Sequence, residues 1–117
     1  VAPGDAHLVC APMTDGHVLR LDRAKSASGC TPSVDPMFDS VARVFGADAF
    51  AVVLSGMGRD GAEGARQVHD AGGSVVAQDQ TTSVVWGMPG AVVSSGVAAA
   101  ILPPEAIGRL IASQRRP

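Results

Sequence analysis

The chain has 117 residues, of which 46% are hydrophobic and 17% are charged, and its formal net charge is −2. That size fits one domain or part of one. The small negative charge and the absence of a run of basic residues exclude a nucleic-acid-binding function. No apolar stretch approaches the ~20 residues of a membrane span, so we also expect no membrane insertion.

The hydrophobic pattern changes its period along the chain, and these changes delimit the expected elements. Apolar runs predict strands over residues 7–11, 17–22, 50–54, 74–78 and 98–102. Helical spacing bounded by Gly and Pro predicts helices over residues 36–45, 61–71, 89–96 and from 104 onward. The first two strands are expected to form a hairpin through Thr14-Asp15-Gly16, and the polar stretch 23–31 is expected to form a loop.

The order of these elements predicts the fold class. From residue 50 onward strands alternate with helices, which is typical of right-handed crossovers in a parallel sheet. We expect an α/β fold with three layers, α/β/α, around a mainly parallel sheet that is Rossmann-like and doubly wound, plus a short hairpin near the N-terminus. Val, Ala, Leu and Ile are expected to build the core, because the chain holds three Phe, one Trp and no Tyr.

Particular residues mark the predicted helix ends. Asp35 is expected to be the N-cap of the first helix, with Pro36 at its first position, and Gly46 is expected to end it. Asp60 and Glu63 have a D-x-x-E spacing close to that of a capping box. A purely structural interpretation of Asp60 is therefore the N-cap of the second helix.

The segment Leu54-Ser55-Gly56-Met57-Gly58-Arg59-Asp60-Gly61 carries the strongest sign of chemistry. It leads from an apolar strand through a glycine-rich turn to a helix N-terminus, where α/β proteins often place a site. Its three glycines match the G-x-G-x-x-G dinucleotide fingerprint, and Asp79 follows the next strand. Asp60, however, would set a carboxylate against the pyrophosphate and compete for its N–H donors. Dinucleotide binding is therefore the weaker interpretation, and we expect no cofactor.

Four blocks of the chain resemble, in the same order, the motifs of CheB-type chemotaxis methylesterases. Leu54 to Gly64, L-S-G-M-G-R-D-G-A-E-G, is similar to the signature L-[ST]-G-M-G-x-D-G-A-x-G. Residues 1–8 resemble the family's A-P-G-D-x-H segment, residues 32–42 its P-S-V-D-x-x-F-x-S-V-A stretch, and residues 77–89 its A-Q-x-x-x-[ST]-S-x-V-[FY]-G-M-P run. These blocks cover nearly the whole chain, which makes the resemblance specific.

The resemblance implies an activity and two site residues. The family's enzymes hydrolyse methyl esters of chemoreceptor glutamates, and some members also deamidate receptor glutamines. By resemblance, Asp60 is the acid of a Ser–His–Asp triad, which holds the histidine tautomer and stabilises the imidazolium. Met57 lies at the implied oxyanion site, where a backbone N–H acts on the developing O⁻. The implied location is the cytoplasm, and the implied partners are methyl-accepting chemotaxis receptors and a receiver domain.

The chain departs from the family pattern in one respect. The G-A-S-T-G-G motif of the family's nucleophile and the Q-H-M motif of its histidine do not occur in residues 1–117. We therefore expect residues 1–117 to be the later part of a single methylesterase catalytic domain, truncated at its N-terminal side, without a receiver domain and inactive alone. Such a truncation would expose an apolar sheet edge, through which the chain could pair with a second copy or with the missing N-terminal segment.

The remaining histidines and cysteines do not suggest a substitute site. His7, His17 and His69 are expected to be structural or solvated, with His69 complementing the C-terminal dipole of the second helix. Cys10 and Cys30 lack metal-ligand spacing, so we expect no metal and two thiols in a reducing cytoplasm. A cross-hairpin disulfide is the alternative for this pair.

The loop over residues 81–87 follows the strand expected beside the one that leads to Asp60. We expect Thr82, Ser83 and Trp86 to wall the site, although Trp86 fits the core equally well. Three functions are compatible with these observations: part of a protein-glutamate methylesterase, a non-catalytic remnant that binds receptor tails or a partner subunit, and a dinucleotide-binding module.

Overall fold

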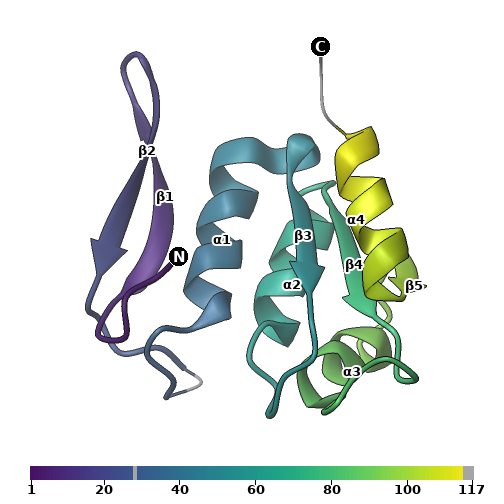
Figure 1. Cartoon of the computed structure of the whole chain (residues 1–117). Coiled ribbons are helices and arrows are strands. Elements are labelled where there is room, and N and C mark those ends of the chain that lie inside the picture. The colour runs from purple at the N-terminus through teal and green to yellow at the C-terminus, as the bar shows by residue number, and fades with distance from the viewer. Residues whose placement is uncertain (28, 115–117) are drawn as a thin grey trace.

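The computed structural model describes residues 1–27 and 29–114, and its elements alternate as predicted (Figure 1). The strands are β1 (His7–Met13), β2 (Gly16–Asp22), β3 (Phe50–Val53), β4 (Ser74–Gln78) and β5 (Ala100–Leu102). The helices are α1 (Val34–Phe45), α2 (Ala62–Asp70), α3 (Gly87–Ser94) and α4 (Pro104–Ser113), and a 3₁₀ turn (Gly46–Asp48) follows α1.

A parallel sheet of order β3-β4-β5 forms the centre of the larger part of the molecule. Its register sets Val53 beside Ala77 and Gln78 beside Leu102. Helices α2 and α3 contact each other and the sheet, and α4 packs on β4. In Figure 1, α2 lies behind the sheet and α4 in front of it. This arrangement confirms the predicted α/β/α fold with a parallel sheet.

The hairpin of β1 and β2 is antiparallel and packs on α1, which lies between it and the parallel sheet (Figure 1). Its register runs from His7 beside Asp22 to Met13 beside Gly16. Residues 14 and 15 therefore make a two-residue turn, where the sequence predicts one. Burial alternates from His7 to Cys10 in β1, whereas β2 is exposed from Gly16 to Leu21.

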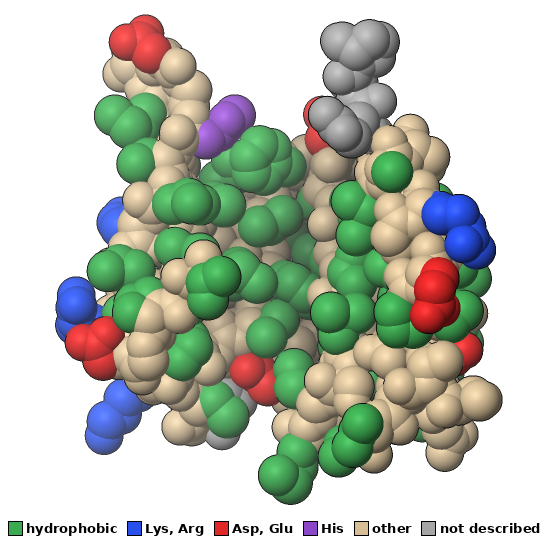
Figure 2. Space-filling model, viewed as in Figure 1, with side chains coloured by type: hydrophobic (Ala, Val, Ile, Leu, Met, Phe, Trp, Pro, Cys, Tyr) green, Lys and Arg blue, Asp and Glu red, His purple; other side chains and the backbone are tan. Residues whose placement is uncertain are grey.

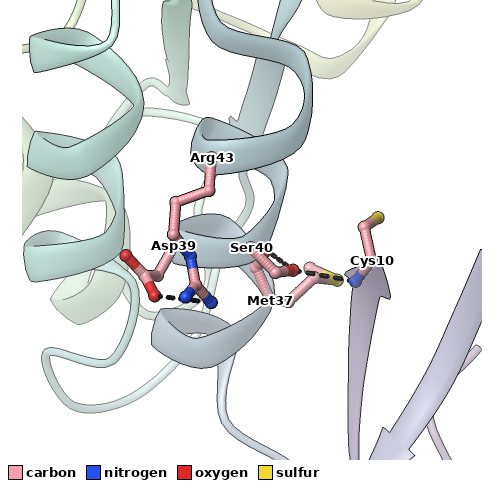
Figure 3. Close-up of polar contacts among 5 residues, drawn as sticks. All are labelled: Cys10, Met37, Asp39, Ser40 and Arg43. Carbon is pink, nitrogen blue, oxygen red and sulfur yellow. Dashed lines mark hydrogen bonds and ion pairs between the residues drawn. The ribbon is translucent and has the colours of Figure 1, made fainter. Parts of the chain in front are cut away.

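Ser40 joins α1 to the hairpin (Figure 3). Its Oγ accepts a hydrogen bond from the Cys10 backbone N–H at 2.9 Å and donates to the Met37 carbonyl at 2.7 Å. Ser40 is buried, so its hydroxyl satisfies a strand N–H that water does not reach. One turn along the same helix, Arg43 and Asp39 form an exposed ion pair at 3.1 Å, which contributes little to stability.

Small apolar side chains form the core between the helices and the sheet. Its buried members are Phe38, Ala42, Ala49, Ala51, Val53, Ala65, Val68, Val75, Ala77, Val92 and Val97. Val and Ala therefore dominate as predicted, whereas none of the described Leu side chains is fully buried. At Gly64 of α2 the two helices α1 and α2 are so close that an added Cβ would lie 2.6 Å from the Phe38 Cβ.

The start of α1 corrects the sequence prediction. The helix begins at Val34, and its N-cap is Ser33 rather than Asp35. Pro36 is therefore the third helical residue instead of the first. The predicted C-terminus is confirmed: Gly46 is the C-cap, with φ of 54°, a conformation that glycine adopts without a Cβ penalty. The shift at the N-terminus arises because the side chain of Asp60, distant in sequence, binds the first N–H groups of the helix.

Two later elements also begin two residues away from the predicted position. Helix α3 begins at Gly87 rather than Pro89, because the Met88 N–H is already held by the Gly56 carbonyl at 2.9 Å. Strand β5 begins at Ala100 and not at residue 98.

Hydrophobic side chains gather at the surface between the hairpin and α4 (Figure 2). Among the described residues β3 pairs only with β4, so β3 is an edge strand and its other edge has no strand partner there. No helix within the described ranges has both the length and the apolar character needed to cross a bilayer.

Candidate functional site

The glycine-rich motif folds as a loop at the carboxyl end of β3. The Gly56 N–H donates to the Val85 carbonyl at 2.9 Å, and the Gly56 carbonyl accepts from the Met88 N–H at 2.9 Å. Gly58 and Gly61 have φ values of 95° and 100°, which glycine tolerates because it has no Cβ. The loop over residues 54–61 contains Asp60, and we call it the acid-bearing loop. It is therefore tied to the loop that follows β4.

Buried Gln78, at the end of β4, also holds the two loops together. Its Oε1 accepts from the Ser55 N–H at 2.8 Å, and its Nε2 donates to the carbonyl and the hydroxyl of Thr82, each at 3.1 Å. Its backbone carbonyl accepts the indole N–H of Trp86 at 2.8 Å. Gln78 is only 5% exposed, and removing its side chain would leave the Ser55 N–H and the two Thr82 oxygens without these partners.

Asp60 caps the N-terminus of α1, although it directly precedes α2. Its Oδ1 accepts from the Ser33 Oγ at 2.7 Å and from the Asp35 N–H at 3.2 Å. Its Oδ2 accepts from the Val34 N–H at 2.8 Å. These are the donors that a helix N-terminus leaves unsatisfied, and the helix dipole favours a negative charge there.

Asp35 makes the reciprocal contact at the N-terminus of α2. Its Oδ1 accepts from the Gly61 N–H at 3.0 Å and from the Gly64 N–H at 2.8 Å. The N-cap of α2 is Gly61, so the interpretation of Asp60 as the cap of its own helix, with Glu63 completing a capping box, is wrong. Each acid instead caps the other helix, and this exchange locks α1 and α2 together.

The exchange has an electrostatic cost at Asp35. Burial raises the pKa of the Asp35 carboxyl above the ordinary value for aspartate, and the negative charges of Asp60 and Glu63 raise it further. The N–H groups of Gly64 and Gly61 act in the opposite direction, because they stabilise the charged form. The charged form of Asp35 is therefore less favoured in the folded chain than in water.

A cavity of about 480 Å³ opens beside the acid-bearing loop. Its lining residues are Ala27, Cys30, Asp35, Met57, Gly58, Arg59, Asp60, Ala62 and Glu63. The two residues predicted for the site, Met57 and Asp60, thus lie on one cavity. Met57 is 83% exposed, and its backbone N–H donates to no other described residue.

His7 lies close to this site but does not form a triad with it. Its Nδ1 accepts the Ser33 backbone N–H at 2.9 Å, so Nε2 carries the ring proton and donates to the Ala24 carbonyl at 2.8 Å. In a Ser–His–Asp triad the imidazole bridges the hydroxyl and the carboxylate. In this chain the Ser33 hydroxyl donates directly to Asp60, and both nitrogens of His7 are engaged elsewhere. His7 is therefore structural, as predicted.

Of the other histidines and the cysteines, Cys30 lines the cavity beside the acid-bearing loop, whereas His17, His69 and Cys10 are not among its lining residues. His17, at the start of β2, lies against the Phe45 ring with centroids 4.7 Å apart. His69 occupies the last turn of α2, as predicted. Cys10 and Cys30 carry thiols rather than a disulfide.

The side chains expected to wall the site have other partners. The Thr82 hydroxyl donates to the Asp79 carboxylate, and the Ser83 Oγ donates to the Asp79 carbonyl at 2.7 Å. Trp86 is half-buried and packs against Gly90, where a Cβ would lie 2.9 Å from its ring. None of these three expected wall residues lines the cavity beside Asp60, so their place in the site stays a prediction.

No group of three His, Cys, Asp or Glu side chains is arranged to hold a metal ion within residues 1–27 and 29–114. The N–H groups at the N-terminus of α2, which a phosphate would use, already donate to the Asp35 carboxylate. The described residues therefore offer carboxylate chemistry at the cavity and no cradle for a cofactor phosphate there.

The sequence analysis did not predict that Ser33, Asp35 and Gln78 hold the site together through side-chain hydrogen bonds. All three lie inside the blocks that resemble the methylesterase family, and only this position indicated that they belong to the site. Nothing in the local spacing indicated what each side chain would contact.

The fold and the site define the class of the protein: an open α/β domain whose acid-bearing loop lies at the carboxyl ends of parallel strands. A family model described as CheB methylesterase matches residues 1–111. The chain therefore belongs to the CheB methylesterase family.

Similar proteins agree with this assignment. The chain is 50% identical over 117 residues to protein-glutamate methylesterase/protein-glutamine glutaminase 2 of Caulobacter vibrioides, covering 99% of this chain and 34% of that protein. It is 47% identical over 122 residues to the Nocardioides protein-glutamate methylesterase/protein-glutamine glutaminase, covering all of this chain and 33% of that protein. It spans about a third of the length of these curated relatives.

A solved structure shares the fold. The crystal structure of the Thermotoga maritima CheB methylesterase catalytic domain matches with a TM-score of 0.86 and 38% identity. The match covers 93% of this chain and 60% of that domain.

Proposed function

We propose that this chain supplies the acid of a Ser–His–Asp site in a protein-glutamate methylesterase. The enzyme would hydrolyse methyl esters of glutamates on methyl-accepting chemotaxis receptors in the cytoplasm, and it would also deamidate receptor glutamines. The observation that carries the proposal is the carboxylate of Asp60, which three donors from the start of α1 hold at the edge of a cavity. Membership of the family gives that acid its reaction.

The proposed mechanism assigns roles to two residues of the loop, Asp60 and Met57. The Asp60 carboxylate accepts the N–H of the triad imidazole and stabilises the imidazolium that forms when the serine loses its proton to the ring. The serine oxygen attacks the ester carbonyl, methanol leaves with that proton, and water then hydrolyses the acyl-enzyme. The backbone N–H of Met57, which donates to no other described residue, supports a place for it in the oxyanion hole. The serine and the histidine would come from sequence outside residues 1–117.

The experiment uses the full-length gene product that contains these residues. Its intact mass, measured first, shows whether it extends beyond 11.8 kDa. Purified protein is then incubated with receptor-bearing membranes whose glutamates carry radiolabelled methyl esters, and released methanol is counted. Methanol release above that of a boiled control supports the esterase. Receptor pull-down without methanol release supports the alternative, a non-catalytic binding protein.

A dinucleotide-binding module fits the site less well. The N–H groups that would hold a pyrophosphate already donate to Asp35, and the Asp60 carboxylate lines the same cavity. We expect no saturable binding of NAD or FAD at about millimolar concentration, a limit that corresponds to roughly −4 kcal/mol.

A further inference from the structure

Ser33 makes an unusual use of an N-cap hydroxyl. A serine at this position usually accepts a hydrogen bond from an N–H group in the first turn of its own helix. In α1 the Ser33 side chain makes no such bond, because the Asp60 carboxylate accepts the first-turn N–H groups instead. The Ser33 Oγ–H donates to Asp60 Oδ1 at 2.7 Å, the shortest of the three bonds to that carboxylate.

Counting acceptor sites shows what this bond leaves available. A carboxylate has about four lone-pair sites, two on each oxygen. Oδ1 of Asp60 receives two donors, from Ser33 and Asp35, whereas Oδ2 receives one described donor, from Val34. One site on Oδ2 is therefore open to a further donor, on a half-buried side chain that lines the cavity.

The position of Ser33 is itself fixed from the opposite side. Its backbone N–H donates to Nδ1 of buried His7, and Nε2 of His7 donates to the Ala24 carbonyl. Ser33 is 4% exposed, so water cannot readily replace its hydroxyl at Asp60. Without that hydroxyl, the carboxylate would keep the Val34 N–H on Oδ2 at 2.8 Å and the Asp35 N–H on Oδ1 at 3.2 Å, the longest of the three bonds, so its rotation would be less restricted.

We infer that Ser33 is a positioning residue for the esterase reaction. Its hydroxyl fixes the rotation of the Asp60 carboxylate so that the open site on Oδ2 meets the N–H of the triad imidazole. This inference rests on the proposed function, since it needs Asp60 to act in the triad. It adds a residue that contacts neither the substrate nor the reacting atoms but acts through Asp60.

The test compares variants of the full-length gene product in the methanol-release assay, with kcat and KM determined separately. Ser33→Ala removes the hydroxyl, and Ser33→Thr keeps it. Ser40→Ala is the matched control: it also removes a buried hydroxyl from α1, but one that bonds the hairpin and not the site. Ser33→Gly replaces Ser33→Ala if the latter does not fold.

We expect Ser33→Ala to lower kcat about tenfold with KM unchanged, as for the loss of a charge-assisted hydrogen bond that orients a catalytic group. Ser33→Thr should restore most of kcat, and Ser40→Ala should leave it near wild type. In an Asp60→Asn background, Ser33→Ala should cause little further loss, because the two residues act as one unit.

Two results would overturn the inference while leaving the proposed function intact. In the first, Asp60→Asn is inactive but Ser33→Ala keeps the wild-type kcat. In the second, Ser33→Ala and Ser40→Ala lower kcat equally, which indicates a general loss of structure. Full activity of Asp60→Asn would refute the proposed function and this inference together.

Discussion

The close approach of α1 and α2 at Gly64 leads to a quantitative prediction. A Cβ added there would lie 2.6 Å from the Phe38 Cβ and 3.1 Å from the Asp35 Cα, well inside the ~3.5–4.0 Å of a favourable carbon contact. These are atoms of the backbone or next to it, so the helices must separate by about 1 Å. Overpacking costs typically about 1–3 kcal/mol, and the better helix propensity of Ala offsets about 1 kcal/mol. Gly64→Ala should therefore lower the free energy of unfolding by up to about 2 kcal/mol.

Gly108 provides the matched control for this substitution. It lies within α4, and a Cβ added there meets nothing within 4 Å. Gly108→Ala should therefore stabilise the chain by up to about 1 kcal/mol. Urea unfolding followed by circular dichroism measures both variants under one condition. Equal stabilities for Gly64→Ala and Gly108→Ala would refute the packing argument for α1 and α2.

Three further substitutions test the contacts around the site. Gly87→Ala sets a Cβ 2.9 Å from the backbone N and O of Gly58, so it should lower the melting temperature and abolish methanol release; a wild-type melting curve would contradict this. The folded state raises the pKa of Asp35, so the stability from this carboxyl is greatest below about pH 4 and is lost as the pH rises through the raised value. In Asp35→Asn the amide oxygen still accepts both N–H groups, so the decline of the free energy of unfolding with pH should become shallower. Urea titrations at several pH values measure this dependence. An unchanged pH dependence would show that another group causes the decline. Trp86→Phe removes the bond to the backbone carbonyl of buried Gln78 and should cost about 1–2 kcal/mol; no change in urea midpoint would show that water replaces the indole N–H.

The parallel sheet could be predicted from the sequence because its strands are short continuous apolar runs bounded by glycine. For the run Ser74–Gln78, the predicted bounds are those of strand β4 in the structure. Periodicity of this kind depends on neighbouring residues alone, so it survives without tertiary information. The same holds for the end of α1 at Gly46, where a positive φ favours glycine.

The site could be predicted only in part. The motif indicated that Met57 and Asp60 belong together, and both line one cavity. The caps could not be assigned, because a D-x-x-E spacing describes one helix, whereas Asp60 and Asp35 bond across 25 or more residues to the other helix. Local sequence shows that a carboxylate is near a helix N-terminus, but tertiary packing decides which helix it caps.

The most direct test of the central proposal is the turnover of Asp60→Asn in the full-length gene product. The amide presents an NH₂ group where the imidazole N–H needs an acceptor, and the equivalent change in a serine protease lowers kcat by about 10⁴. Because Asp60 also caps α1, the assay is run well below the melting temperature of the variant, with folding checked by circular dichroism. We predict a folded protein whose methanol release falls by at least about a thousandfold. A folded Asp60→Asn variant with near wild-type methanol release would contradict the assignment of Asp60 to the triad.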